Sequence, residues 1–243
     1  DGRDDRALTQ LNALLPWNCF VVDAHGRRFG NVAWSTKRTE PQVIPDPRIL
    51  EFHRRFGLAG KSVVEIGCFE GIHTIALCRL AARVTAIDSR IDNVAKTSLR
   101  CTLFGHAPTV RVCDIERVPA DAETLRADLC HHVGVLYHLR DPVAHLLDLG
   151  RWVGEGIMLD THFAEPDEAT ERYCVGGAEW AYKRYGEYGE KDPFSGMYDH
   201  AKWLTLDGLR QVLASAGFAQ VEVIEQRAER NGARALLYAR RNA

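Results

Sequence analysis

From Lys61 onward, short apolar segments typical of β-strands alternate with segments that have the apolar spacing of helices. Such alternation predicts a mostly parallel sheet with helices on both faces. The predicted strands are 62–66, 83–87, 109–113, 129–136, 156–160, 221–224 and 235–239. The predicted helices are 72–82, 91–104, 142–153 and 206–216. We therefore expect a doubly wound α/β fold with a seven-stranded sheet, whose last two strands form an antiparallel pair at one edge.

Two segments depart from this alternation. Residues 1–60 contain apolar runs at 19–22 and 29–33 around a turn composition, which predicts a β-hairpin, followed by a short helix at 48–56. We expect this part to be an N-terminal extension or cap on a domain that spans 61–243. Residues 161–203 are rich in aromatic, glycine and charged residues. A long irregular segment after a strand is usually functional, so we expect a lid or substrate-binding insertion after the fifth strand.

The composition and charge of the chain limit the kinds of molecule that it is expected to bind. The chain has 243 residues, a formal net charge of -2 and a sequence pI of about 6.6, so its bulk charge does not favour nucleic acid. No apolar run approaches the roughly 20 residues that a membrane span needs. The cysteines number seven, with no Cys-x-x-Cys pair, which predicts reduced thiols. We expect a cytoplasmic protein with a small-molecule partner and no membrane partner, and a homodimer stays open.

The loop after the first strand of the alternation reads Glu65-Ile66-Gly67-Cys68-Phe69-Glu70-Gly71. Gly67 allows a sharp turn and a close approach of a ligand to the backbone, and Gly71 lets the following helix start close to the strand. The free N–H groups at the start of that helix point toward the loop. Glu65 would repel a phosphate but attract an amino group. The loop therefore favours a nucleoside-like ligand that carries a positive charge.

Two further acids follow the next two strands. Asp88 suits a pair of ribose hydroxyls, and Asp114 can accept a hydrogen bond from the amino group of adenine. An ammonium group, a ribose and an adenine together describe S-adenosylmethionine better than NAD, which stays the alternative ligand. Each aspartate could instead serve as a helix cap or a turn residue.

These motifs resemble those of class I S-adenosylmethionine-dependent methyltransferases, most clearly over residues 61–149. The usual loop of one acid and three glycines appears as Glu65-x-Gly67-x-Phe69-x-Gly71, with Phe69 in place of the middle glycine. This aromatic residue and the run Gly134-Val135-Leu136-Tyr137-His138-Leu139-Arg140-Asp141-Pro142 are similar to the tRNA wobble-uridine carboxymethyl-transferring enzymes. The resemblance implies a Rossmann-like fold, S-adenosylmethionine as cofactor and S-adenosylhomocysteine as product. The cofactor-binding residues that we expect are Glu65, Gly67, Cys68, Phe69, Gly71, Asp88, Asp114 and Gly134.

The end of the fourth strand holds the candidates for catalysis. Gly134 removes a Cβ where the methionine part of the cofactor would pass, and Tyr137 and His138 would point into the site. Methyl transfer from a sulfonium depends mainly on positioning, but an oxygen or nitrogen nucleophile can need a base. We expect His138 to be that base, because histidine titrates near neutral pH, although a structural histidine is an equal alternative. A metal site formed by His138, Asp160 and His162 is disfavoured against a hydrogen-bond network, so we expect no metal.

The aromatic insertion supplies the candidates for binding the acceptor. His162, Trp180, Tyr182, Arg184 and Tyr198 are the residues that we expect to contact it. Aromatic rings can stack on a flat acceptor, and the cationic side chains of this segment can hold an anionic one. The rings could equally form the small core of the insertion itself, and the cations could be a solvated surface.

The leading hypothesis is methyl transfer to a small-molecule acceptor of natural-product or saccharide type. One alternative is carboxymethyl transfer to a tRNA wobble uridine from carboxy-S-adenosylmethionine. In the enzymes that carry out this reaction, the residue matching Tyr137 contacts the extra carboxylate, and Lys37 and Arg38 are the candidates for the basic partners. The second alternative is a cofactor-binding protein without catalytic activity.

Overall fold

The computed structural model describes residues 5–23, 25–31, 39–117 and 122–242. The α-helices are α1 (Asp5–Leu14), α2 (Pro47–Phe56), α3 (Ile72–Leu80), α4 (Ile91–Leu103), α5 (Pro142–Trp152) and α6 (Leu206–Ser215). The strands are β1 (Phe20–Val22), β2 (Arg28–Gly30), β3 (Ser62–Ile66), β4 (Arg83–Asp88), β5 (Thr109–Val112), β6 (Ala127–Val133), β7 (Val153–His162), β8 (Glu171–Val175), β9 (Ala178–Gly186), β10 (His200–Leu204), β11 (Gln220–Glu229) and β12 (Gly232–Arg240). Lys37 and Arg38 lie outside the described residues, as do positions 32 and 33 of the predicted hairpin.

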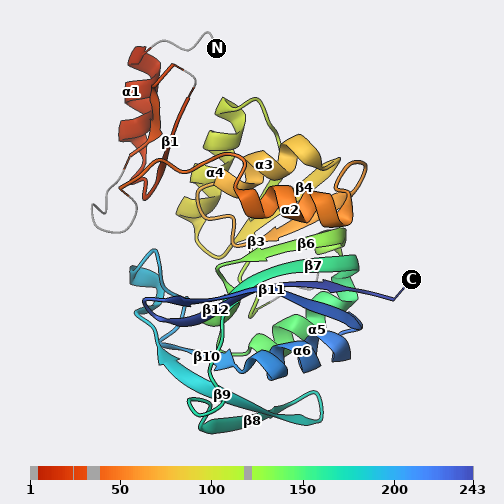
Figure 1. Cartoon of the computed structure of the whole chain (residues 1–243). Helices are drawn as coiled ribbons and strands as arrows, with labels where there is room; N and C mark the ends of the chain where they lie inside the picture. The colour runs from red at the N-terminus through yellow and green to blue at the C-terminus, as the bar shows by residue number, and fades with distance from the viewer. Residues whose placement is uncertain (1–4, 24, 32–38, 118–121, 243) are drawn as a thin grey trace. The chain divides into compact units, whose positions relative to one another are not determined.

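The largest sheet has seven strands in the order β11-β12-β7-β6-β3-β4-β5 (Figure 1). Strand β6 runs parallel to β3 and β7, and β4 runs parallel to β5. Strand β12 is antiparallel to both of its neighbours, β7 and β11. These pairings confirm the predicted mostly parallel α/β sheet and the antiparallel pair at its edge.

The chain divides into two compact units. The first consists of residues 1–60 and 68–112, and the second consists of residues 61–67 and 113–243. The N-terminal 60 residues therefore share a unit with α3, β4, α4 and β5.

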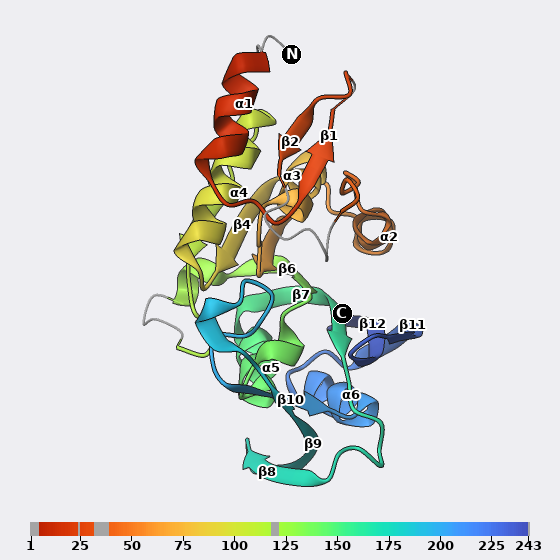
Figure 2. The ribbon, with the colours of Figure 1, turned by 90° about the vertical axis from the view of Figure 1, so that its left-hand side faces the viewer.

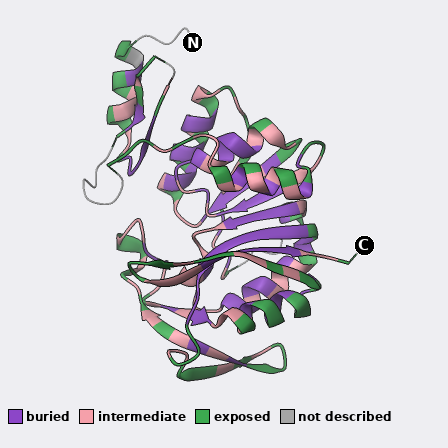
Figure 3. Cartoon of the chain, viewed as in Figure 1, coloured by how far each residue is buried: buried purple, intermediate pink, exposed green. Residues whose placement is uncertain are grey.

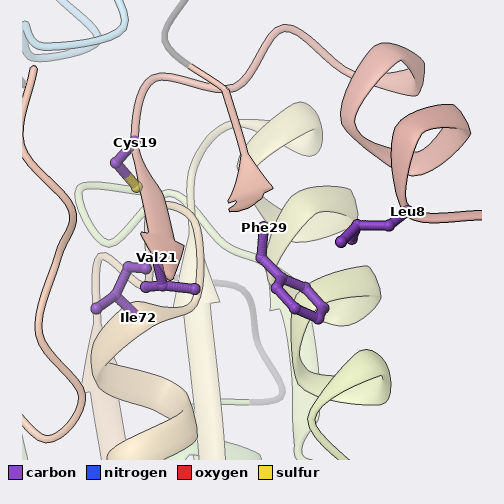
Figure 4. Close-up of a cluster of buried hydrophobic side chains, with 5 residues drawn as sticks. All are labelled: Leu8, Cys19, Val21, Phe29 and Ile72. Carbon is purple, nitrogen blue, oxygen red and sulfur yellow. The ribbon is translucent and has the colours of Figure 1, made fainter. Parts of the chain in front are cut away.

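In the first unit, α3 contacts β4, and α4 contacts both β4 and β5. The N-terminal part adds a small apolar cluster in which Leu8 of α1, Val21 of β1 and Phe29 of β2 lie with Ile72, the first residue of α3 (Figure 4). Helix α2 begins after Asp46, whose carboxylate accepts a hydrogen bond from the backbone N–H of Arg48 and so caps the helix. The predicted hairpin and short helix are therefore present.

In the second unit, the middle strands of the sheet are buried, as Figure 3 shows for β6 and β7. Helices α5 and α6 lie side by side (Figures 1 and 2), and they contact β7 and β11 respectively. Gly150 of α5 makes this approach close, because a Cβ there would lie 2.3 Å from the backbone oxygen of Ala216. No helix in the described part of the chain is long and apolar enough to cross a membrane.

The insertion after β7 is more regular than its sequence suggests. It contains β8 and β9, which form with β10 a three-stranded antiparallel sheet. Buried Trp180 and Tyr182 alternate along β9 with less buried Ala181 and Lys183, a spacing of two that fits a strand with one covered face. The abundance of glycine and charge around these positions hides that alternation in the sequence.

Candidate functional site

Glu65 lies in β3 within the second unit and is 1% exposed. It is paired in register with His131 of β6, and its Oε1 lies 3.8 Å from His131 Nδ1. Gly67 follows with a φ of 75°, and a Cβ at this position would lie 2.2 Å from Cγ2 of Val135. Only glycine therefore fits the turn after β3, as the sequence analysis expects.

The rest of the loop belongs to the first unit. The backbone N–H of Cys68 donates to the carbonyl oxygen of Ile87 at 2.9 Å. Phe69 has a φ of 50°, which is the left-handed conformation that glycine adopts more easily. Gly71 has a φ of 77°, and a Cβ there would lie 3.1 Å from the Cα of Thr97 in α4. The loop is therefore tightly folded against α4, even though Phe69 replaces a glycine.

Asp88 lies at the end of β4 and is buried. Its Oδ2 accepts a hydrogen bond from the backbone N–H of Phe69 at 3.0 Å, and its Oδ1 accepts from Arg90 N and Asn93 Nδ2. Burial raises the pKa of Asp88, although these hydrogen bonds oppose the rise. Since each carboxylate oxygen has two lone pairs, Oδ2 keeps capacity for a further donor such as a ribose hydroxyl.

Asp114 follows β5 and belongs to the second unit. The hydroxyl of Tyr198 donates to its Oδ2 at 2.8 Å, and the backbone N–H of Glu116 donates to its Oδ1. The guanidinium of Arg140 lies 3.3 Å from the centroid of the Tyr198 ring. Tyr198, which we predicted for the acceptor, thus lies at the acid predicted for adenine.

Tyr137 and His138 lie in a short 3-10 helix (Leu136–His138) soon after Gly134. His138 Nδ1 lies 2.7 Å from Oε1 of Glu187, whose Oε2 accepts hydrogen bonds from the hydroxyl of Ser195 and the backbone N–H of Gly196. Burial acts to raise the pKa of Glu187, but the hydrogen bonds from His138 and Ser195 outweigh burial and leave the pKa below its usual value. An ionised carboxylate therefore fixes the orientation of the His138 ring.

The Tyr137 ring lies next to one cationic and one aromatic side chain. The Arg234 guanidinium lies 5.4 Å from its ring centroid, and the His162 ring lies nearly perpendicular to it with 4.6 Å between centroids. A Cβ at Gly134 would lie 3.8 Å from Nη2 of Arg234 and 3.9 Å from the Tyr137 hydroxyl, so this glycine lies beside both side chains. Burial raises the pKa of Tyr137, with the nearby Arg234 charge opposing the rise. Tyr137 is therefore a neutral hydrogen-bond donor at physiological pH.

His162 is part of an aromatic stack. Its ring lies nearly parallel to Trp203 with 4.8 Å between centroids, and the Tyr185 ring lies nearly parallel to Trp203 at 4.3 Å. The Trp203 indole N–H donates to the backbone oxygen of Tyr137 at 2.8 Å, which ties the stack to the 3-10 helix. Burial and the Arg234 charge lower the pKa of His162, so the imidazole is neutral near pH 7.

The residues weighed for a metal site have protein partners instead. Asp160 accepts hydrogen bonds from Arg227 and Arg234, and His162 Nδ1 lies 3.1 Å from the backbone oxygen of Ala233. With His138 paired to Glu187, each of the three takes part in a hydrogen-bond network.

Three residues predicted for the acceptor lie elsewhere on the insertion. Trp180 and Tyr182 are buried, and they occupy the face of β9 opposite to that of Tyr185. The Tyr182 hydroxyl donates to Glu171, and the Trp180 indole N–H donates to the backbone oxygen of Val175. Arg184 is exposed. Both rings thus belong to the packing of the insertion.

Sequence reasoning missed several residues that the fold places beside His138 and Tyr137. They are Tyr185, Glu187, Trp203 and Arg234. Their positions depend on the register of the β9–β10 pair and on the antiparallel pairing of β12 with β7, where Arg234 lies opposite His162. The only local signal is the alternation of Lys183, Tyr185 and Glu187, and it does not identify a partner.

Comparisons with known proteins agree with this architecture. A family model described as "Methyltransferase domain" matches residues 42–223. The chain is 29% identical over 220 residues to a tRNA U34 carboxymethyltransferase of Methylococcus capsulatus, which covers 87% of this chain and 61% of that protein. It is 26% identical over 172 residues to a ubiquinone biosynthesis O-methyltransferase of Psychrobacter arcticus, which covers 69% and 63% respectively. The chain therefore spans about three fifths of the length of these curated relatives.

Among solved structures, the N-terminal domain of EvdMO1 with SAH bound is similar to almost the whole chain. The TM-score is 0.81, the identity is 25%, and the match covers 99% of this chain and 98% of that one. In the structure of EvdMO1 itself, the match covers 98% of this chain but 48% of EvdMO1. The family model spans three quarters of the sequence and confirms the resemblance that the glycine loop indicates. The chain therefore belongs to the methyltransferase domain family.

Proposed function

We propose that this protein binds S-adenosylmethionine and transfers its methyl group to a hydroxyl of a small saccharide-type acceptor. The observation that carries this proposal is the near-complete match, in both directions, to the N-terminal domain of EvdMO1. That domain was solved with SAH bound and also in the presence of SAH and D-fucose. Family membership supports the transfer reaction, and the printed ligands of this neighbour support the acceptor class.

The residues present fit the donor. When bound, S-adenosylmethionine supplies a methyl group on a positively charged sulfur. Buried Glu65 suits the amino group, and Asp88 has a lone pair at Oδ2 for a ribose hydroxyl. Gly134 has a φ of 77° and no side chain, and it lies beside the Tyr137 hydroxyl, which suits close passage of the methionine part of the donor.

His138 would take the proton of the acceptor hydroxyl. Its Nδ1 is held by ionised Glu187, which leaves Nε2 as the basic nitrogen and stabilises the imidazolium that forms. As the new C–O bond forms, the C–S bond breaks, the sulfur keeps the electron pair, and the proton goes to His138. Neutral Tyr137 can hold the acceptor by donating a hydrogen bond.

The direct test uses the full chain and S-adenosylmethionine with a labelled methyl group. Free and nucleotide-linked deoxysugars serve as acceptors, and mass spectrometry locates the label. We expect a labelled methyl ether on a sugar hydroxyl and release of S-adenosylhomocysteine. Label transfer to tRNA but to none of the sugars would contradict the acceptor class, and no transfer to any acceptor would favour the alternative of a binding protein without catalysis.

A second candidate function is carboxymethyl transfer, and one contact favours it. The guanidinium of Arg234 lies over the Tyr137 ring, so a cation stands beside the residue that matches the carboxylate-contacting tyrosine of the tRNA enzymes. Against this, Asp160 and Glu229 both form ion pairs with Arg234 and already balance its charge. We expect S-adenosylmethionine to bind more tightly than its carboxylated form; the reverse order in competition calorimetry would favour carboxymethyl transfer.

A further inference from the structure

Glu70 is a buried carboxylate within the glycine loop that none of the steps above uses. It lies between Phe69 and Gly71 and is 0% exposed. Its Oε1 accepts hydrogen bonds from the backbone N–H of Asn18 at 2.7 Å and from Asn18 Nδ2 at 3.1 Å. Its Oε2 accepts from the backbone N–H of Cys19 at 3.0 Å. The loop side chain is therefore held by a segment that lies about fifty residues earlier in the sequence.

Two buried cations of α4 complete this network. Lys96 Nζ lies 3.1 Å from Oε1 of Glu70, and Arg100 Nη2 lies 3.7 Å from Oε2. Both cations are 1% exposed, so an unpaired charge here would be costly. Arg100 also donates to the backbone oxygen of Cys19 at 3.1 Å, and so it links α4 to the same N-terminal residue.

The Cys19 thiol belongs to the network as a donor. Its Sγ lies 3.0 Å from Oε2 of Glu70. Burial and the Glu70 charge raise the pKa of Cys19 to about 11, with Arg100 opposing the rise. The thiol therefore keeps its proton at neutral pH and can donate it to the carboxylate.

Apolar packing holds the other side of Gly71. Ile72 lies in one buried cluster with Leu8, Val21 and Phe29, and Figure 4 shows Val21 next to Ile72. Phe69 packs against the same cluster. Three residues around Gly71 are thus in contact with the N-terminal segment or its apolar cluster. They are Phe69, Glu70 and Ile72.

These contacts lie at and next to the loop residues whose backbone conformation is unfavourable. Phe69 and Gly71 both have positive φ values, and a non-glycine residue in that region persists only when its surroundings hold it. The family model begins at residue 42, so the segment that supplies the support lies before the family-matched part of the chain.

We infer that residues 17–22 and 28–30 act as a clamp that holds loop 68–71 in its cofactor-binding conformation, with Glu70 as the positioning residue. This inference rests on the proposed binding of S-adenosylmethionine. Glu70 does not contact the donor; it acts through the backbone of Phe69 and Gly71. The N-terminal segment then contributes to the donor site by fixing this loop, and it is not only a cap.

Calorimetric titration with S-adenosylhomocysteine tests the clamp in the full chain. We expect Glu70→Gln to weaken binding about tenfold, because an amide cannot balance Lys96 and Arg100 and the loop loses its fixed position. Asn18→Ala, which removes one donor and no buried charge, should weaken binding by about threefold. Asp23→Asn is the matched control, since Asp23 lies at the turn of the hairpin, outside the clamp, and its carboxylate pairs with Arg27. Its affinity should equal that of the unmodified protein.

Hydrogen exchange of the ligand-free proteins separates a positioning role from a general loss of stability. In folded Glu70→Gln, or in Asn18→Ala if the first variant does not fold, the amides of 68–71 should exchange faster while those of β6 and β7 do not change. Unchanged affinity and unchanged exchange in Asn18→Ala and in folded Glu70→Gln would overturn the clamp. If the unmodified protein does not bind S-adenosylhomocysteine, the proposed function fails, and the exchange result still decides whether the clamp exists.

Discussion

Phe69 shows that a single residue can depart from a family pattern while the backbone keeps its shape. The sequence marks this position as unusual because methyltransferases commonly have glycine there. In the structure, Phe69 takes a φ of 50°, which costs a non-glycine residue about 1–2 kcal/mol. Its N–H donates to Asp88, and its carbonyl accepts from Thr97 at 3.2 Å. These bonds and its apolar packing retain the glycine-like turn.

The pair formed by His138 and Glu187 supports a prediction at the same scale. We expect His138→Ala to lower turnover at least about tenfold while S-adenosylhomocysteine still binds, because the base is lost and the donor contacts remain. Glu187→Gln should lower turnover less, since the ring keeps a hydrogen-bond partner but loses the charge that stabilises the imidazolium.

Glu190→Gln is the control for that pair of variants, because Glu190 is an exposed acid three residues further along the insertion. Steady-state kinetics with a saturating donor measure all three variants. Full turnover in His138→Ala would remove this histidine from the mechanism and leave it a structural residue.

At the scale of elements, β6 and α5 share an unusual buried contact. Nε2 of His132 in β6 lies 2.8 Å from Nε2 of His145 in α5, and both residues are buried. Burial lowers the pKa of His132 to about 3, and burial together with His132 holds the pKa of His145 well below its usual value. Both rings are therefore neutral in the folded protein, and the N–H of one ring donates a hydrogen bond to the unprotonated nitrogen of the other.

This contact predicts an acid-sensitive fold. Below about pH 6.5 the two histidines bind protons in the unfolded chain but not in the folded one, so the free energy of unfolding falls as the pH drops. From pH 7.5 to 5.5 we expect the pair to account for a loss of about 2–3 kcal/mol. Urea unfolding at both pH values measures it. A His132→Leu/His145→Leu variant should lose less stability over this range, and an equal loss would show that other groups are responsible.

The helices and strands also show which parts of the fold can be inferred from the sequence. The alternation of strands and helices after Lys61 is confirmed because apolar spacing at two and at 3.6 residues depends only on neighbouring residues. Helix α1 and the strands of the insertion were not predicted. In the insertion, Trp180 and Tyr182 face one way and Lys183 and Tyr185 the other, and the chemistry of these side chains does not distinguish the faces.

At the scale of the whole molecule, the sequence could suggest single candidate residues but not which of them lie together. Glu65, Gly67 and Gly134 lie at or just after strand ends, as the sequence predicts, and a parallel sheet commonly brings ligand-binding residues there. The partner of His138 lies 49 residues away, at a position that follows from the register of an antiparallel sheet. The carboxylate of Glu70 is held by Asn18 and Cys19, more than fifty positions earlier. Long-range pairing of this kind has no local pattern.

The central claim of this account is that the chain binds an adenosyl sulfonium donor, and one calorimetric titration tests it most directly. Folded, unmodified protein is titrated with S-adenosylhomocysteine and, in parallel, with NAD. We predict saturable binding of one S-adenosylhomocysteine per chain and no binding of NAD. Binding of NAD, or no heat with S-adenosylhomocysteine from protein shown to be folded, would contradict the claim.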